Sequence, residues 1–585
     1  MPLSSSAADP GAIRSPVAVE VRANLRLALP LIAAQLAGVG MGAVDTVFAG
    51  RLGAPALAAV AIGVNLNVVF FVLFMGLYMA CSPLVAHMVG AQRPPAEISG
   101  FIRRARRFAW IAGCAWMLLL NLLAAPALRR VGLEAGTERQ ALAFMHALSF
   151  SAIGMSLWFT LRFCAEGLGQ TRPVLFAGVA GLACNALLDW LLVFGHAGLP
   201  ALGATGCGVA TSVSSLLMAG LLHLQFRRRR GLREVLQAAP AACAEGVGDI
   251  LRVGLPIGLI MLAEAGLFVL ASLLMARFGV DTVAAYQVAI NFASMVFMIP
   301  VGVAQATTVR VGHAAGAGAY AAARFRGFVG IGMGLGNAAS NAAIMALFGG
   351  AIAALYTDDD GIAAMATRFL LLAAAFQLFD GVQSTANGAL RGFKDTRLPM
   401  LITLVSYWLI GLPVAWWLAF GAGLGPDGLW WGLSAGLAAA AFVLGVVVNT
   451  VQAVRFHHQA KTQQQANEQR FNELFPGQRV ASLALDTQVE QQAQILRGGN
   501  GKGDLFALLQ QASDSLAATP GLTLNSFEFR EGALFLDLGG NDLQLLEKLR
   551  GWFAGHHGAN LEVQQADAGE SGVKIRVKLT AARTS

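Results

Sequence analysis

The chain has 585 residues, of which 56% are hydrophobic and only 13% charged, and its mean hydropathy is +0.61. Soluble domains carry about 25% charged residues, so a chain this poor in charge cannot cover a water-soluble core of such size. For most of its length the composition excludes a soluble enzyme, an intrinsically disordered chain and a nucleic-acid-binding module. It indicates a polytopic membrane protein instead.

The N-terminal residues 1–22 are rich in Ser, Ala and Pro and lack the pattern of a secretory signal peptide, so we expect a disordered cytoplasmic leader. About twelve apolar runs follow, each close to the roughly 20 residues that a helix needs to cross a bilayer. The runs lie near 27–48, 57–80, 108–127, 143–163, 174–195, 205–226, 251–275, 284–305, 327–350, 365–388, 398–420 and 429–453. The sequence therefore predicts an all-α protein with about twelve transmembrane helices.

The connections between the runs alternate in charge. Basic residues gather in the even-numbered ones, as in the segment 103–107 and the run 227–230, and Arg391, Lys394 and Arg397 lie in the tenth. The third connection, with Arg129, Arg130 and Arg139, departs mildly from this pattern. Because basic loops stay inside, the pattern predicts that both ends of the helix bundle lie in the cytoplasm.

The two halves of the apolar region repeat each other. Leu29-Pro30 recurs as Leu255-Pro256, at an offset of 226 residues (255 − 29). At the same offset Arg51, Asn65, Gly76 and Gly90 recur as Arg277, Asn291, Gly302 and Gly316. The repeat predicts two six-helix lobes, residues 23–228 and 229–455, related by an axis along the membrane normal, as in many transporters.

Four acids lie inside the predicted spans: Asp45, Asp189, Glu264 and Asp380. A charged side chain at the bilayer centre costs on the order of 3 kcal/mol, so such residues usually face a cavity or a partner. Their depths match in pairs, and Asn185 lies one turn before Asp189, which predicts one polar cluster in each half. Each cluster could hold a proton or a Na⁺; the alternative is that the acids only hold helices together by hydrogen bonds.

Three further residues are candidates for the same region. Gln287 and Asn291 are one turn apart on the eighth helix, and we expect them to join the cluster of the C-terminal half. Pro30 removes a backbone hydrogen bond from the first helix, which makes it either a conformational hinge or simply a residue of the first helical turn.

These motifs together resemble the multidrug and toxin extrusion (MATE) family, most closely its bacterial NorM-like branch. The resemblance spans roughly residues 20–455 and rests on the segment 41–50, on Leu255-Pro256 followed by Glu264, and on Phe379-Asp380 with Leu390-Arg391-Gly392. It implies a two-lobed antiporter of the bacterial inner membrane that needs no cofactor and expels organic cations in exchange for Na⁺ or H⁺.

Carried over by position, the resemblance assigns roles to the membrane acids. Asp45, Asn185 and Asp189 match the family's proton or cation site in the N-terminal lobe, and Glu264 and Asp380 match its Na⁺ site in the C-terminal lobe. Phe376 stands where some Na⁺-coupled members carry a tyrosine, which weakens the Na⁺ assignment. We predict that Phe376, Gln287 and Asn291 line the substrate cavity, and the sequence leaves the choice of coupling ion open.

The C-terminal tail is of a different kind. Residues 456–500 read as a polar helical linker, and residues 501–585 as an α-β-β-α-β-β unit, which predicts a small ferredoxin-like α+β domain. The tail resembles the periplasmic domain of the type II secretion system L protein. In that family the domain is periplasmic, whereas twelve spans would place this tail in the cytoplasm, so its side of the membrane stays open.

Two other functions are alternatives to the antiporter. A lipid-precursor flippase of the same superfamily would need a cavity rich in Arg and Lys, and the predicted spans carry almost none centrally. An inner-membrane component of type II secretion, acting and binding partners through the tail, would leave the membrane acids unexplained. No P-loop, GxSxG or HExxH motif occurs in a strand–helix context, so we predict a non-enzyme whose partners are organic cations and membrane lipids, without nucleic acid.

Overall fold

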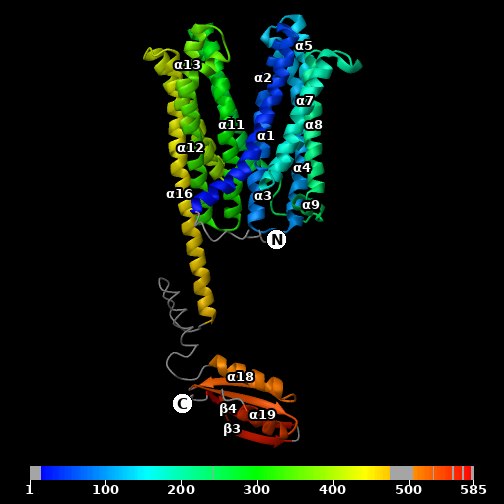
Figure 1. The fold of residues 1–585 in the computed structure, drawn as a ribbon, viewed down its shortest axis with the longest axis vertical. Coiled ribbons are helices and arrows are strands. Elements are labelled where there is room, and N and C mark those ends of the chain that lie inside the picture. Colours follow the sequence, from blue (N-terminus) through cyan, green and yellow to red (C-terminus); the bar gives the residue numbers. More distant parts are fainter. Residues whose placement is uncertain are drawn as a thin grey trace. The chain divides into compact units, whose positions relative to one another are not determined.

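The computed structural model describes residues 15–241, 243–474, 505–530, 532–555, 559–569 and 572–581. The chain divides into two compact units, Met1–Gln459 and Ala460–Ser585. Within the described part of the first unit, twelve helical segments are long and apolar enough to cross a membrane. The predicted all-α class of the membrane region is therefore confirmed (Figure 1).

The N-terminal lobe consists of the first six spans. Two of these spans are built from two consecutive helices each, α2 with α3 and α5 with α6, and the short helix α9 follows the lobe. The helices are α1 (Pro16–Arg51), α2 (Ala54–Met79), α3 (Cys81–Gly90), α4 (Pro95–Val131), α5 (Ala135–Ser149), α6 (Ser151–Gly167), α7 (Arg172–Phe194), η1 (His196–Gly198), α8 (Ala204–Arg228) and α9 (Arg230–Gln237).

The C-terminal lobe consists of the other six spans, and its eleventh span contains two stretches of π-helix, η3 and η4. The elements are α10 (Val247–Met275), η2 (Ala276–Phe278), α11 (Val280–Gly316), α12 (Tyr320–Ala354), α13 (Asp360–Gly392), α14 (Arg397–Leu404), η3 (Val405–Gly411), α15 (Leu412–Trp416), η4 (Trp417–Gly421) and α16 (Pro426–Leu474). Arg391, which the sequence placed in a connection, belongs to the last turn of α13 because that helix continues to Gly392.

Contacts between the lobes follow the sequence repeat. A Cβ atom at Gly76 would come within 3.0 Å of Gly258, and one at Gly302 within 3.0 Å of Ile32, the position 226 residues before Gly258 (258 − 32). Only glycine allows backbones to approach so closely. The two lobes therefore pack on each other through matched surfaces, as two-fold related repeats do.

A second symmetric pair of contacts lies where α3 and α11 end. His87 Nε2 lies 2.7 Å from the carbonyl oxygen of Gly392, and His313 Nε2 lies 2.8 Å from that of Gly167. Each bond joins one lobe to the other. In Figure 1 the lobes approach each other at this end of the bundle and stand apart at the end where α5 and α13 begin.

Helix α1 connects the two lobes. It is continuous from Pro16 to Arg51, so Pro30 lies inside the helix and the interpretation of Pro30 as a residue of the first turn is wrong. The first half of α1 contacts the C-terminal lobe: the amide of Asn24 donates to Thr307 Oγ1 at 3.1 Å, and Glu20 forms an ion pair with Arg310. The two halves of α1 thus belong to different packing environments, on either side of Pro30.

The second unit holds an antiparallel sheet and two helices. It comprises α18 (Leu505–Ala518), β1 (Thr523–Arg530), β2 (Ala533–Gly540), α19 (Gln544–Gly555), β3 (Ala559–Gly569) and β4 (Gly572–Ala581). The strand order is β1-β2-β4-β3, and the two helices pack with the sheet around their own apolar core. This is a ferredoxin-like arrangement in which the first strand has moved to the end, and it confirms the predicted α+β class.

Two predicted segments fall largely outside the described residues. Of the leader predicted at 1–22, residues 16–22 belong to α1, because Pro16 and the side-chain cap from Ser15 begin a helix there. Of the linker predicted at 456–500, residues up to Leu474 continue α16, and residues 475–500 lie outside the description.

Candidate functional site

The predicted polar cluster of the N-terminal lobe is assembled from three helices. Asn185 on α7 donates its amide to Asp45 Oδ1 on α1 at 3.1 Å, and the Thr211 hydroxyl on α8 donates to Asp45 Oδ2 at 2.8 Å. Asp189, one turn after Asn185, contacts the Asp45 carboxyl group. Thus the three predicted residues meet, and Thr211 joins them.

The Asp189 carboxyl group has an unusual environment. It is fully buried, and among the described residues the side chains that interact with it are the Asp45 carboxyl group and the Cys207 thiol. Two buried carboxyl groups in contact repel each other when both are ionised. A proton or a small cation shared between Asp45 and Asp189 would remove that repulsion, so the pair is chemically suited to bind one.

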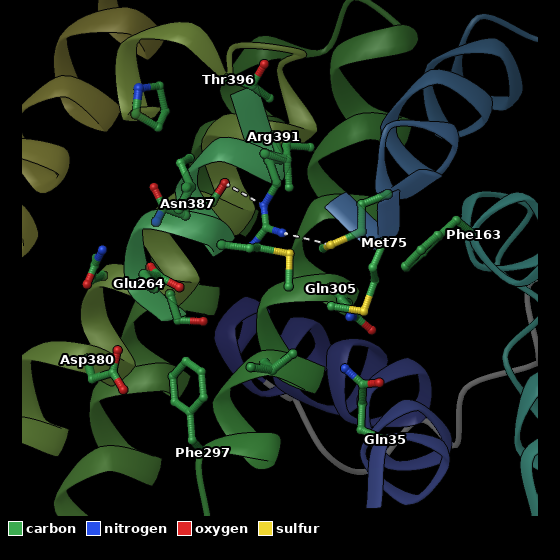
Figure 2. Close-up of a pocket in the computed structure, with 18 of the residues that line it drawn as sticks. Gln35, Met75, Phe163, Glu264, Phe297, Gln305, Asp380, Asn387, Arg391 and Thr396 are labelled. Carbon is green, nitrogen blue, oxygen red and sulfur yellow. Dashed lines mark hydrogen bonds between the residues drawn. The ribbon is translucent and has the colours of Figure 1, made fainter. Parts of the chain in front are cut away.

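The acids of the C-terminal lobe face open space between the lobes. Glu264 on α10 and Asp380 on α13 line the same two adjoining cavities, and Figure 2 shows both carboxyl groups directed into one space. The first cavity is also lined by Gln35 and Phe163 of the N-terminal lobe, so it lies at the interface of the lobes. The predicted depth match of Glu264 and Asp380 therefore corresponds to a shared cavity.

Tyr407 completes this site from the π-helical stretch η3. Its hydroxyl lies 2.6 Å from Gln383 Oε1 and 3.5 Å from Glu264 Oε1. A π-helical turn shifts the side-chain register by one position, and such turns are common at functional sites. Sequence reasoning missed Tyr407 because a single hydroxyl in an apolar run gives no charge signal. The available clue was the rarity of tyrosine, since the chain has only five.

The cavity also contains two arginines, which lie near the ends of their helices and not at the centre of the predicted spans. Arg162 on α6 is bonded to Glu166 at 2.8 Å and to Gln35 at 2.8 Å. Arg391 donates to the Asn387 carbonyl at 3.2 Å, and its electrostatic interaction is with Glu264 (Figure 2). Arg391 lines the cavity because α13 extends past the apolar run to Gly392.

Of the three residues predicted to line the substrate cavity, one lines a cavity and two do not. Phe376 lines the second cavity beside Asp380, as predicted. Gln287 instead donates to Ser272 Oγ at 3.3 Å, and Asn291 accepts from the Tyr356 hydroxyl at 3.0 Å. Neither of these two lines the cavities that hold Glu264, because the spacing that puts them on one face of α11 does not determine what that face meets.

A metal ion would find few anionic ligands here. Within the described ranges no group of three or more His, Cys, Asp or Glu side chains comes together. A Na⁺ ion at Glu264 and Asp380 would therefore take its other ligands from neutral oxygens, which suits a hard monovalent cation. Tyr407 and Gln383 are the nearest such groups that the hydrogen bonds identify.

Two repeated six-helix lobes with a charged cavity at their interface are the architecture of a membrane transporter. The MatE family model matches residues 30–191 and 256–417, one match in each lobe. The chain belongs to this family, whose members are transporters and not enzymes. The match ends at residue 417, so the likeness of the tail to the type II secretion L protein remains a prediction.

Curated relatives agree with the family match. The chain is 38% identical over 433 residues to a "Probable multidrug resistance protein NorM" of Xanthomonas campestris pv. campestris, covering 73% of this chain and 94% of that protein. It is 37% identical to the "Multidrug resistance protein PmpM" of Pseudomonas aeruginosa, covering 73% and 91%. Both comparisons confirm the sequence-based resemblance to the NorM-like branch.

Solved structures share the fold. The eukaryotic MATE transporter AtDTX14 superposes with a TM-score of 0.68 at 22% identity, covering 76% of this chain and 99% of that one. An outward-facing conformation of a multidrug resistance MATE family transporter gives 0.69 at 19% identity, covering 75% and 97%. At these identities the similarity establishes the two-lobed architecture and nothing finer.

Proposed function

We propose that this protein is a cation-coupled multidrug antiporter that exports organic cations across the bacterial inner membrane by alternating access. The main support for this function is that Glu264 and Asp380 line one cavity between two lobes that are joined at one end. The printed names of the NorM and PmpM relatives support a drug as the cargo. The basic residues near the joined end support an outward-open state under the positive-inside rule.

The proposed cycle follows from charge. An organic cation enters the cavity, where the carboxylates of Glu264 and Asp380 attract it and where Phe163 and Phe297 offer apolar surface. When the cavity opens outward, the coupling ion neutralises the acids and the drug loses its counter-charge. The lobes then rock about their interface, and release of the ion inside restores the charge that binds the next drug.

We further propose that the N-terminal pair holds a proton during this cycle. Asp45 and Asp189 are buried and in contact, and among the described side chains Asp189 otherwise interacts with the Cys207 thiol. A shared proton satisfies both carboxyl groups in the space that is present. The alternative coupling ion is Na⁺, bound at Glu264 and Asp380, and the transport experiment described next distinguishes the two ions.

The experiment is ethidium transport in everted vesicles, with an imposed pH gradient and an imposed Na⁺ gradient applied separately. Proton coupling predicts transport with the pH gradient alone, abolished by Asp45→Asn. Na⁺ coupling predicts transport with the Na⁺ gradient alone, abolished by Asp380→Asn. Transport that ignores both gradients would refute the antiport mechanism.

The lipid-precursor alternative is disfavoured by the charge of the cavity. The lining holds two arginines, Arg162 and Arg391, and two acids, Glu264 and Asp380, so its net charge is zero (2 − 2) when all are ionised. Arg162 is moreover held by Glu166. With Arg162 neutralised by this pair, the lining leaves one arginine and two carboxylates, so it favours an organic cation over a pyrophosphate headgroup.

A further inference from the structure

Arg391 is a basic side chain of the cavity that is bonded to neutral groups only. It lines the same cavity as Glu264 and Asp380, and Figure 2 shows its side chain reaching from α13 into that space. It donates to the Asn387 carbonyl at 3.2 Å and to Met79 Sδ of the other lobe at 3.9 Å. In the part of the chain that the structure describes, Arg391 forms no ion pair. Its charge therefore acts on whatever occupies the cavity.

The internal repeat shows that this arrangement belongs to one lobe only. Asn387 and Arg391 on α13 stand 225 residues after Arg162 and Glu166 on α6 (387 − 162 and 391 − 166). The glycine that follows each pair is contacted by a histidine of the other lobe, which supports the alignment. In the N-terminal lobe the two positions hold an arginine and a glutamate that pair at 2.8 Å. In the C-terminal lobe they hold an amide and an arginine, so this arginine keeps its full charge.

The charge of the cavity follows from this difference. Arg162 and Glu166 neutralise each other. Arg391 then stands against the carboxylates of Glu264 and Asp380, which gives a net charge of −1 (1 − 2) when all three are ionised. One monovalent cation balances that charge, whereas a divalent cation leaves one positive charge in excess. Because the site is partly removed from water, the excess charge is repelled more strongly than it would be in solution.

We propose that Arg391 is a specificity-determining residue that makes the cavity select organic cations with one positive charge over those with two. The inference rests on the proposed export of organic cations and names the substrate class of the same cavity. An arginine side chain is suited to this role because it is not deprotonated in proteins, so its charge persists throughout the transport cycle.

The test compares two dyes that share one aromatic ring system. Ethidium carries one positive charge, and propidium carries a second one on its side chain. Fluorescence titration of the full chain, purified in neutral detergent, gives the Kd of each dye, and the ratio of the two values measures selectivity. Arg391→Gln removes the charge and Arg391→Lys keeps it. The matched control Arg129→Gln removes the same charge from an exposed side chain of α4.

A further variant covers the case in which Arg391→Gln does not fold. Asn387 lies one turn before Arg391, so Asn387→Asp places an acid where the N-terminal lobe has the partner of its own pair. This variant retains Arg391 and neutralises it, and the net charge of the cavity changes by the same amount as in Arg391→Gln. Its effect on the ratio of the two Kd values should therefore be the same.

We expect the wild type, Arg129→Gln and Arg391→Lys to prefer ethidium. In Arg391→Gln and Asn387→Asp both dyes should bind more tightly, and the ratio should move about tenfold towards propidium. An unchanged ratio, with ethidium still bound, would overturn the selectivity and leave the proposed function intact. A shift in Arg391→Lys as large as in Arg391→Gln would also overturn it, because charge would then not be the cause. A wild type that binds neither dye would contradict the proposed export of cations itself.

Discussion

At the scale of single residues, charge inside an apolar run was the most informative signal. Asp45, Asn185 and Asp189 meet as expected, because burying an acid is costly enough to require a partner. The roles of neutral polar residues were harder to predict. Thr211 and Tyr407 complete the two clusters, yet a hydroxyl is tolerated almost anywhere in a membrane helix. Spacing told which side chains share a face but not what that face contacts.

The variant Asp45→Asn tests the role of the N-terminal cluster. The amide has the size of the carboxyl group and can still bond with Asn185 and Thr211, but it cannot release a proton at physiological pH. We expect efflux of ethidium to be abolished while the protein remains in the membrane at wild-type abundance, measured in whole cells and by immunoblot. Retained drug resistance would show that Asp45 has no part in coupling.

The variant Tyr407→Phe tests the C-terminal site. Losing the hydroxyl leaves the buried Gln383 oxygen without its donor and removes a contact with Glu264, which should cost about 1–3 kcal/mol. We expect a lower unfolding temperature together with a changed KM for the exported cation. The matched control is Tyr286→Phe, whose hydroxyl lies 3.4 Å from the Phe268 carbonyl and touches no acid. A control with the same change in KM would contradict the specific role of Tyr407.

At the scale of elements, the apolar runs predicted every span but not how far each helix extends. Helix α13 reaches Gly392 and carries Arg391 into the cavity, and α1 begins at Pro16 and crosses to the other lobe. These extensions are polar segments stabilised by tertiary contacts, which a hydropathy window does not register. Pro30 lies between the two halves of α1, so its role as a hinge remains a prediction.

The ion pair at the start of α1 provides a test of how the lobes are held together. Glu20 is buried, and Arg310 donates to its Oε1 at 2.8 Å while Arg326 lies 3.6 Å from its other oxygen. Replacing one member of a buried pair leaves uncompensated charge, at a cost of about 3–5 kcal/mol. We expect Glu20→Gln to separate the lobes at this end, seen as a longer distance between spin labels placed on α3 and α11.

The control for this experiment is Glu97→Gln. Glu97 pairs with Arg93 at 2.8 Å on the same side of the protein, but both residues belong to the N-terminal lobe and are accessible to water. Such a pair contributes at most about 1 kcal/mol. The spin-label distance should therefore stay unchanged in Glu97→Gln, and an equal shift in both variants would point to general destabilisation instead of a specific contact between lobes.

At the scale of the whole molecule, composition alone separated the membrane region from the tail. The change near residue 455 lies close to the division of the chain at Gln459. The internal repeat predicted the two lobes, and the matched contacts of Gly76 and Gly302 show that its symmetry extends to their interface. The sequence could not place the tail relative to the membrane, because orientation depends on insertion and not on local pattern.

Ending the chain after Gln459 separates the transport function from any function of the tail. The shortened chain retains both family-matched segments and all twelve candidate spans, and the NorM relative is matched over 94% of its length by 73% of this chain. The second unit has its own apolar core, and the described core clusters of the lobes contain no residue from it. We expect wild-type ethidium efflux from vesicles that contain equal amounts of the shortened and full-length proteins. Loss of efflux at equal abundance would instead assign the tail a part in transport. It would also revive the alternative of a secretion component, which a pull-down of secretion proteins with the full chain would test.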